Sequence, residues 1–290
     1  MAYPFHFFRS PGSKCWFIPR AEQFVREVRP KTIVEPFAGS GVVGLTLLNR
    51  GYCGRLVMAE KDPARHAFWE AALNDPMLHD RAFRWIREVW TQPVEKQADF
   101  VTESLTQMET SDPPLFALLH ALSSFNGIVH GRNSINGRRP IRYWLLETLD
   151  SSLQFVYEAR GKIELLSDAF DTLRRTDSPD SYAFVDPPYS AGRNSPGHKL
   201  YRESEIDHEA LFHLLGKWRG SWQLTSEHGA EMRRYLRLAA PVLGPIRTYT
   251  VRMHTGRGHK KVELVTEKRA DKNGSAGSVS DGGAGGSSDA

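Results

Sequence analysis

The chain has 290 residues, of which 40% are hydrophobic and 25% are charged. These fractions are typical of a globular protein and exclude a fibrous or wholly disordered chain, and a protein of this length can bury a full core without disulfide bonds. Lys and Arg number 38 and Asp and Glu number 34, so the net charge of +4 permits an anionic partner without requiring one.

The two cysteines, Cys15 and Cys53, are too few for a disulfide framework or a four-thiolate zinc site. We expect no metal site and a protein that is reduced and cytoplasmic. Residues 1–13 lack the apolar region and cleavage site of a secretory signal. No apolar run reaches the length of about 18 residues that a membrane span needs, so we expect no membrane partner.

Residues 32–60 predict a strand–helix–strand unit. A short buried strand is expected at 32–35, and a loop follows at 36–41. The next helix is expected at 42–50, with apolar residues at helical spacing and Gly51 as its C-terminal cap. A second strand at 56–59 completes the unit, and the right-handed crossover makes the two strands parallel.

The middle of the chain predicts an insertion at 65–150. Residues 64–125 have mainly helical patterns, and another helix is expected at 144–159. Between these segments, Asn136-Gly137 is the strongest short signal for a β-hairpin.

The alternation of strands and helices resumes after the insertion. Strands are expected at 162–166, 182–185 and 222–226, and helices at 208–217 and 230–238. Two last strands, at 246–253 and 260–267, flank a glycine-rich turn and predict an antiparallel edge pair. The fold class is therefore α/β, with a Rossmann-like, doubly wound, mostly parallel sheet formed by 1–64 and 151–268. Residues 269–290 have no aromatic residue and predict a disordered tail.

A glycine-rich segment lies between the first strand and the first helix. Its residues, Gly39-Ser40-Gly41-Val42-Val43-Gly44, match the dinucleotide-binding fingerprint, and Glu60 follows the second strand. Glycines let a ligand approach the backbone, and an acidic residue at the next strand end can accept hydrogen bonds from ribose hydroxyls. The glycines alone leave open which nucleotide binds, and a tight turn without a ligand is the alternative.

A second motif follows the strand at 182–185, and it reads Asp186-Pro187-Pro188-Tyr189. The consecutive prolines restrict the residues before them, so we expect Asp186 to be held extended at the carboxyl edge of the sheet. Open α/β sheets bind their ligands at this edge.

Together these motifs resemble the Dam-type DNA adenine methyltransferases, with the motif order of the alpha group. The resemblance covers residues 8–267 and includes Pro11-Gly12-Ser13-Lys14, Glu35-Pro36-Phe37-Ala38-Gly39-Ser40-Gly41, Ser124-Phe125-Asn126-Gly127, the stretch 257–263 and the tetrapeptide at 186–189. It implies that the insertion at 65–150 is a mainly helical target-recognition segment that carries the β-hairpin.

The resemblance implies S-adenosylmethionine as the cofactor, with S-adenosylhomocysteine as the product. Lys14 and Gly12 would close over it, Glu60 would bond its ribose, and Asp168 would meet its adenine amino group. Ser10 departs from the aromatic residue that relatives often carry there. The full expected set is Ser10, Pro11, Gly12, Lys14, Glu35, Pro36, Phe37, Ala38, Gly39, Ser40, Gly41, Glu60, Asp168, Ala169 and Asp186.

The resemblance also implies the chemistry. The Asp186 carboxylate and the Pro187 carbonyl would each accept one proton of the adenine amino group, and Tyr189 would stack on the base. Pro188 completes the catalytic tetrapeptide. An adenine inside a duplex is out of reach, so it must be flipped out of the helix.

The partner that the resemblance implies is double-stranded DNA, bound by a chain that is a monomer or a weak dimer. Residues 129–143 contain four arginines and no acidic residue, and arginine and asparagine can read base edges. A solvated basic loop is the alternative. The expected DNA contacts are Asn126, Arg132, Asn133, Asn136, Arg138, Arg139, Arg142, Arg257, Lys260 and Lys261.

Four alternative functions stay open at this point. The same geometry serves transfer to the amino group of cytosine, and it also serves adenine in RNA. A catalytically silent DNA-binding protein is a third alternative. A nicotinamide-dependent dehydrogenase would explain the glycines and leave the tetrapeptide at 186–189 unexplained.

Overall fold

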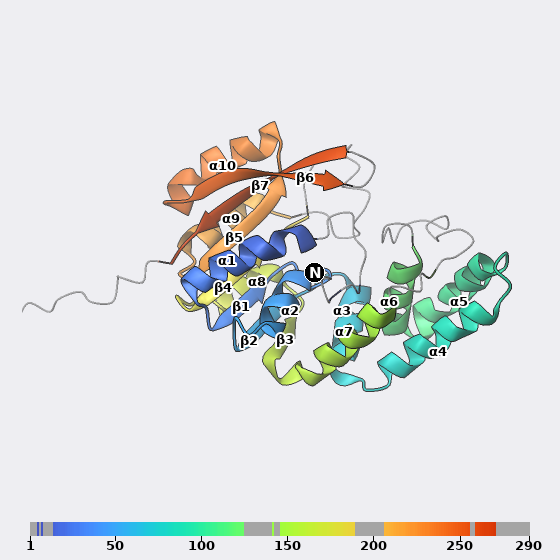
Figure 1. Cartoon of the computed structure of the whole chain (residues 1–290). Coiled ribbons are helices and arrows are strands. Elements are labelled where there is room, and N and C mark those ends of the chain that lie inside the picture. Colours follow the sequence, from blue (N-terminus) through green and yellow to red (C-terminus); the bar gives the residue numbers. More distant parts are fainter. Residues whose placement is uncertain are drawn as a thin grey trace, which may run out of the picture.

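The computed structural model describes residues 5, 7, 14–124, 141, 146–188, 206–255 and 259–270. At its centre is a seven-stranded sheet with the order β3-β2-β1-β4-β5-β7-β6, and helices lie on both of its faces (Figure 1). The predicted α/β class, with a doubly wound and mostly parallel sheet, is confirmed. None of the helices in the described ranges is long and apolar enough to cross a membrane.

Five parallel strands form the larger part of the sheet. They are β1 (Thr32–Glu35), β2 (Arg55–Ala59), β3 (Ile163–Leu166), β4 (Ser181–Val185) and β5 (Ser221–Glu227). Every residue of β4 is buried, as expected for a parallel strand that is covered on both faces. The chain builds β2 and β3 on one side of β1 and β4 and β5 on the other, so the strand order reverses between β1 and β4. This switch point is where doubly wound sheets bind ligands.

The two last strands close one edge of the sheet. β7 (His259–Lys268) pairs antiparallel with β5 and with β6 (Arg247–Thr255). The predicted antiparallel edge pair is therefore confirmed, with β6 as the outer strand.

Two hydrophobic clusters cover the opposite faces of the sheet. One contains Ile33 and Tyr182 together with residues of α1 (Ile18–Val28), α2 (Val42–Asn49) and the helices that follow β2. The other contains Val34 and Ala183 together with residues of α8 (Ala169–Arg175), α9 (His208–Lys217) and α10 (Ala230–Leu243). Neighbouring residues of β1 and β4 thus point to different cores, as the pleat of a strand requires.

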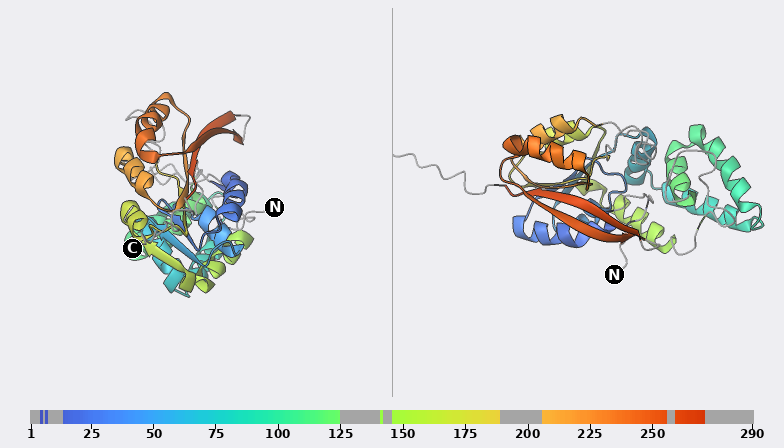
Figure 2. Two further views of the ribbon diagram at one scale, coloured as in Figure 1. Left: turned by 90° about the vertical axis from the view of Figure 1, so that its left-hand side faces the viewer. Right: turned by 90° about the horizontal axis from the view of Figure 1, so that it is seen from above.

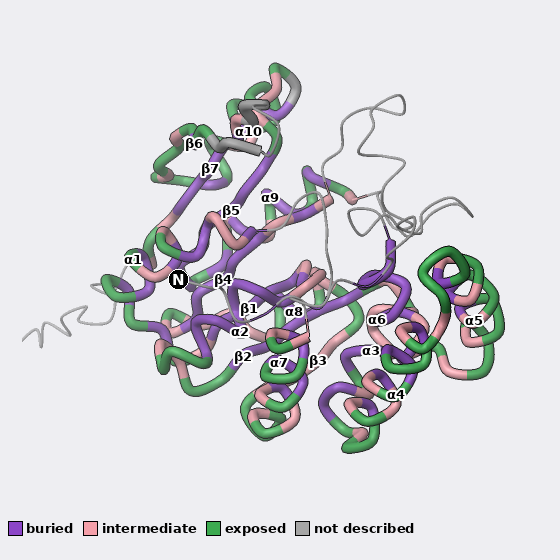
Figure 3. Tube along the Cα trace, turned by 45° about the vertical axis from the view of Figure 1, so that its right-hand side comes forward, coloured by how far each residue is buried: buried purple, intermediate pink, exposed green. Residues whose placement is uncertain are grey.

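A group of helices extends from one end of the sheet (Figure 2). It consists of α3 (Pro63–Asn74), α4 (Leu78–Thr91), α5 (Gln97–Ser111), α6 (Pro113–Ser123) and α7 (Leu146–Glu158). The predicted helical character of this segment is confirmed. The outer turns of α4 and α5 are exposed, whereas the central strands are buried along their length (Figure 3). The hairpin predicted at Asn136-Gly137 lies outside the described residues.

Several boundaries differ from the prediction. The helices α1 and α8 and two short 3-10 helices, Cys15–Phe17 and Arg160–Lys162, were not predicted. Helix α10 continues through Pro241 to Leu243 and ends before Gly244, which has a φ of 70°.

The prediction that the disordered tail begins at 269 is wrong for its first two residues. The Arg269 guanidinium lies 2.6 Å from a carboxylate oxygen of Glu27, and the Ala270 amide donates to the Ser221 hydroxyl at 2.9 Å. These contacts attach the chain to α1 and to β5. The rest of the predicted tail lies outside the described residues.

Candidate active site

The loop between β1 and α2 forms one side of the site. Gly39 and Gly41 have φ values of 50° and 61°, which L side chains rarely adopt. The Ala38 amide donates to the Ala59 carbonyl at 2.9 Å, so the loop is attached to the end of β2. A Cβ added at Gly39 would meet no described atom within 4 Å. The backbone at Gly39 is therefore open to a ligand.

The other side of this loop is packed against α3. The Trp69 indole donates to the Gly39 carbonyl at 3.1 Å. A Cβ added at Gly41 would come within 3.2 Å of the same ring. The prediction assigned Trp69 to the insertion that begins at 65, yet its side chain supports the glycine loop. The expected cofactor site thus includes a residue that the sequence analysis missed.

Glu60 follows β2 and is only 8% exposed. One of its carboxylate oxygens accepts a hydrogen bond from the Asp62 amide at 3.0 Å, and its own amide donates to the Leu166 carbonyl at 3.1 Å. Burial raises the pKa of Glu60 above its ordinary value. Its position next to the glycine loop fits the predicted role as an acceptor for ribose hydroxyls.

Glu35 is the last residue of β1 and is 3% exposed. Burial raises its pKa to about 8; the amides of Gly44 and Val43 oppose the shift, and the nearby Asp186 adds to it. Its Oε2 atom is buried and has no hydrogen-bond partner among the described residues. At neutral pH the Glu35 side chain is therefore mostly uncharged.

Gly44 lies in the first turn of α2 and is close to the Glu35 side chain. A Cβ at this position would come within 2.6 Å of Leu56 Cδ1 and 2.7 Å of Glu35 Oε2. We expect Gly44→Ala to lower the free energy of unfolding by about 1–3 kcal/mol, because the added methyl group has no space. Urea denaturation followed by circular dichroism measures this change. Gly54→Ala is the control, because the nearest atom to its Cβ is 3.9 Å away. Equal free energies of unfolding for Gly44→Ala and Gly54→Ala would contradict the prediction that the methyl group has no space at position 44.

Asp186 follows β4 and has a partner at each carboxylate oxygen. Oδ1 accepts a hydrogen bond from the Thr225 hydroxyl at 2.6 Å, and Oδ2 lies 2.8 Å from the Lys14 ammonium. Lys14 is 4% exposed and also lies 3.8 Å from a carboxylate oxygen of Glu263. A carboxylate offers about four lone pairs, so Asp186 can still accept hydrogen bonds from a substrate.

The structure brings most of the described predicted residues to one edge of the sheet. Glu35 ends β1 and Asp186 follows β4, and these strands are parallel neighbours. In the loop at 36–41, Pro36 and Ala38 are buried, and Phe37 and Ser40 are partly exposed. Pro187 is buried and Pro188 is partly exposed.

Asp168 follows β3 at the same edge of the sheet. Its Oδ1 atom accepts a hydrogen bond from the Asp171 amide at 2.7 Å and so caps α8, which begins at Ala169. Helix capping is thus a structural role for Asp168 that the sequence analysis did not include.

Other predicted residues are not brought into this group. Lys260 and Lys261 lie in β7, opposite His254 and Met253 of β6. Outside the described residues lie Ser10, Pro11, Gly12, Asn126, Arg132, Asn133, Asn136, Arg138, Arg139, Arg142, Tyr189 and Arg257.

The sequence analysis also missed Thr225, and it included Glu263 only within the stretch 257–263. The strand register is the signal that points to Thr225, because Val185 pairs with Leu224 and the residues that follow come side by side. In the described part of the chain, no group of three or more His, Cys, Asp or Glu side chains could hold a metal ion.

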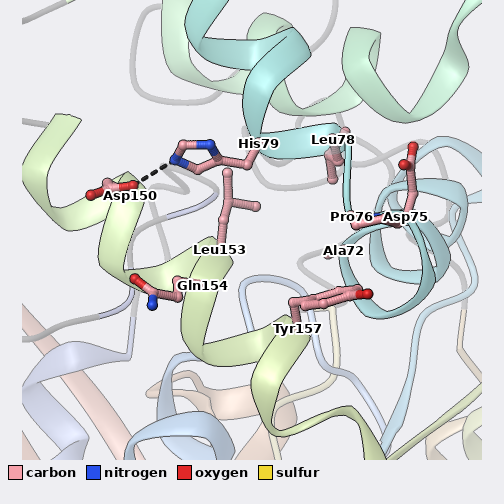
Figure 4. Close-up of a pocket in the computed structure, with 9 residues that line it drawn as sticks. All are labelled: Ala72, Asp75, Pro76, Leu78, His79, Asp150, Leu153, Gln154 and Tyr157. Atoms are coloured by element: carbon pink, nitrogen blue, oxygen red, sulfur yellow. Dashed lines mark hydrogen bonds and ion pairs between the residues drawn. The ribbon is translucent and has the colours of Figure 1, made fainter.

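A separate pocket of about 240 Å³ lies between α3, α4 and α7 (Figure 4). His79 and Asp150 are joined at its margin by a contact of 2.5 Å, and both side chains are more than a third exposed. None of the predicted site residues lines this pocket.

No protein-family model matches the chain, and no curated protein matches its sequence. Among solved structures, a candidate RNA methyltransferase from Pyrococcus horikoshii matches with a TM-score of 0.41 and 9% identity, over 93% of this chain and 90% of that one. A precorrin-8w decarboxylase from Methanobacterium thermoautotrophicum matches with a TM-score of 0.40 and 12% identity, over 92% and 98%. A precorrin-6y C5,15-methyltransferase from Geobacter metallireducens matches with a TM-score of 0.38 and 12% identity, over 91% and 93%. Since these TM-scores are below 0.5, we base the function on the residues of this chain.

Proposed function

We propose that this protein is an S-adenosylmethionine-dependent methyltransferase that modifies the exocyclic amino nitrogen of an adenine flipped out of double-stranded DNA. The main support is the Asp186 carboxylate at the end of β4, which is held by Lys14 and Thr225 beside the glycine loop. The resemblance of the tetrapeptide at 186–189 to the Dam-type enzymes supports adenine as the target.

Three features of the glycine loop and its surroundings fit the cofactor. The backbone at Gly39 is open, Glu60 offers a carboxylate at the adjacent strand end, and Glu35 has a buried oxygen without a partner among the described residues. We infer that these residues would hold the ribose and the amino acid portion. When bound, S-adenosylmethionine would supply an electrophilic methyl group on a sulfonium.

Asp186 would act on the target nitrogen. An adenine amino group is a poor nucleophile, because its lone pair is delocalised into the ring. A carboxylate that accepts one of its protons in a hydrogen bond favours a tetrahedral nitrogen and frees that lone pair. The negative charge also stabilises the positive charge that grows on the nitrogen during transfer. Lys14 and Thr225 hold the carboxylate in place, so little rearrangement is needed when the base arrives.

The proposed DNA partner is supported by the sequence. The net charge is +4, and residues 129–143 carry four arginines and no acidic residue. Arginines neutralise phosphates and can read guanine, and asparagine can read adenine. Extrusion of the adenine from the duplex costs a few kcal/mol, which contacts to the backbone and the base would offset.

A methyl-transfer assay with the full chain tests this proposal. The protein is incubated with tritium-labelled S-adenosylmethionine and with unmodified duplex DNA, single-stranded DNA or RNA, and the labelled nucleoside is then identified. We expect N6-methyladenine in duplex DNA. Label in cytosine would instead indicate a cytosine methyltransferase, and label in RNA alone would indicate an RNA methyltransferase.

A thermal-shift experiment tests the cofactor independently of the substrate. We expect S-adenosylhomocysteine to raise the melting temperature and NADH to leave it unchanged, because ligand binding to the folded state alone stabilises it. Stabilisation by NADH alone would favour a dehydrogenase. No transfer to any nucleic acid despite binding of S-adenosylhomocysteine would exclude the proposed reaction.

A further inference from the structure

We propose that Thr225 is a positioning residue that sets the orientation of the Asp186 carboxylate for methyl transfer. This inference rests on the proposed function, because it concerns the same site. Thr225 lies in β5, which pairs in parallel with β4, and Val185 is opposite Leu224. The residue after each of these comes next in register, so Asp186 passes beside Thr225 as it leaves the sheet.

The hydrogen bond between the two side chains is short and partly buried. The Thr225 hydroxyl donates to Asp186 Oδ1 at 2.6 Å, and Thr225 is 0% exposed. O–H···O⁻ bonds of this length are typical of bonds in which the acceptor is charged. The donor is therefore shielded from water, whereas the Asp186 side chain is 21% exposed and is accessible to a substrate.

Lys14 alone does not define the direction of the carboxylate. Its ammonium lies on a flexible four-carbon chain and has three donors without a fixed plane. It lies 2.8 Å from Asp186 and 3.8 Å from Glu263, so it is shared by two carboxylates. Thr225, in contrast, projects from a central strand, and its β-branched side chain has few rotamers. A fixed donor on Oδ1 and a charge on Oδ2 together determine which way the remaining lone pairs of Asp186 point.

We expect removal of the Thr225 hydroxyl to lower the rate of methyl transfer and to leave cofactor binding unchanged. Thr225 is not among the residues expected to hold the cofactor, whereas a turned Asp186 carboxylate would miss the amino proton of the substrate. We expect Thr225→Val, which keeps the shape and removes the donor, to lower kcat about 10- to 100-fold. We expect KM for S-adenosylmethionine and the affinity for S-adenosylhomocysteine to stay within about twofold, since the lost interaction acts on the reacting group alone.

Two further variants separate positioning from packing. Thr225→Ser restores the hydroxyl without the methyl group, and we expect its kcat to lie within about threefold of wild type, because the donor is kept. Thr266→Val is the matched control, because Thr266 is also 0% exposed and in the sheet but contacts the Thr248 hydroxyl. If Thr225→Val does not fold, Thr225→Cys, with a weak donor of similar size, takes its place.

The outcomes distinguish this inference from the proposed function. A wild-type chain that transfers no methyl group to DNA or RNA overturns the proposed function, and the role of Thr225 is then rejected with it. An active wild type with unchanged kcat in Thr225→Val overturns the inference alone. Equal losses in Thr225→Ser and Thr225→Val also overturn it, because they would indicate packing rather than the hydroxyl.

Discussion

Replacement of Asp186 by asparagine is expected to lower the rate of methyl transfer by about 1000-fold, the usual effect of removing one group that stabilises developing charge. The amide keeps the shape of the carboxylate, whose two oxygens lie 2.8 Å from the Lys14 ammonium and 2.6 Å from the Thr225 hydroxyl. Its single oxygen can still accept a hydrogen bond from Lys14, and its NH2 group can donate one to the hydroxyl oxygen of Thr225. It lacks the negative charge that stabilises the growing positive charge on the amino nitrogen. Because asparagine keeps a hydrogen-bond acceptor for the buried Lys14 ammonium, we expect the fold to be retained while the chemical step is slowed.

Single-turnover methyl transfer at saturating S-adenosylmethionine measures this effect, and titration with S-adenosylhomocysteine shows whether the cofactor still binds. Asp180→Asn is the control, because Asp180 precedes β4 and its side chain is 47% exposed in an ion pair with Lys31. Full activity of Asp186→Asn would show that the negative charge of Asp186 is not needed for methyl transfer.

Alanine at position 186 is a less informative substitution. Lys14 is 4% exposed, and the Asp186 carboxylate lies 2.8 Å from its ammonium. The Glu263 carboxylate is farther away, at 3.8 Å, so alanine at position 186 removes the nearer of these two negative charges. A buried ammonium that loses a partner destabilises the fold. A loss of activity in Asp186→Ala would therefore combine a chemical effect with a structural one.

The central strands could be predicted because each has a short apolar segment, Ile33-Val34 in β1 and 182–185 in β4. Residues 182–185 and 33–35 are buried, and each strand is followed by a loop with glycine or proline. Helix α1 could also have been predicted. Ala21, Phe24, Val25 and Val28 recur at helical spacing and are all buried.

The contacts inside the site could not be predicted in the same way. Thr225 meets Asp186 because of the register between β4 and β5, and a sequence does not state how strands align. Trp69 has the apolar pattern of any core helix, so nothing in its spacing indicates that its indole bonds the Gly39 carbonyl. The motifs thus located the edge of the sheet where the site lies, and the packing supplied the residues that support it.

Glu35 predicts a pH dependence of stability that can be measured without any substrate. Its pKa is about 8 in the folded protein, mainly because of burial, against an ordinary value of 4.5. Between these two values the folded state binds more protons than the unfolded state, so the free energy of unfolding falls as the pH rises. The stabilisation is complete below about pH 4.5 and is lost as the pH rises to about 8. A shift of this size corresponds to about 5 kcal/mol over the whole interval.

Glu35→Gln should remove this dependence, since the amide resembles the protonated carboxyl group and does not titrate. We expect the wild type to lose stability relative to Glu35→Gln as the pH rises from 4.5 to about 8, the two pKa values of Glu35. Urea denaturation at a series of pH values measures the difference between the two proteins, which cancels the contribution of the other groups. Glu70→Gln is the control, because that side chain is 64% exposed and should follow the wild type. Parallel curves for the wild type and Glu35→Gln would mean that Glu35 is ionised in the folded protein, and its carboxylate would then need a cationic partner at the end of β1.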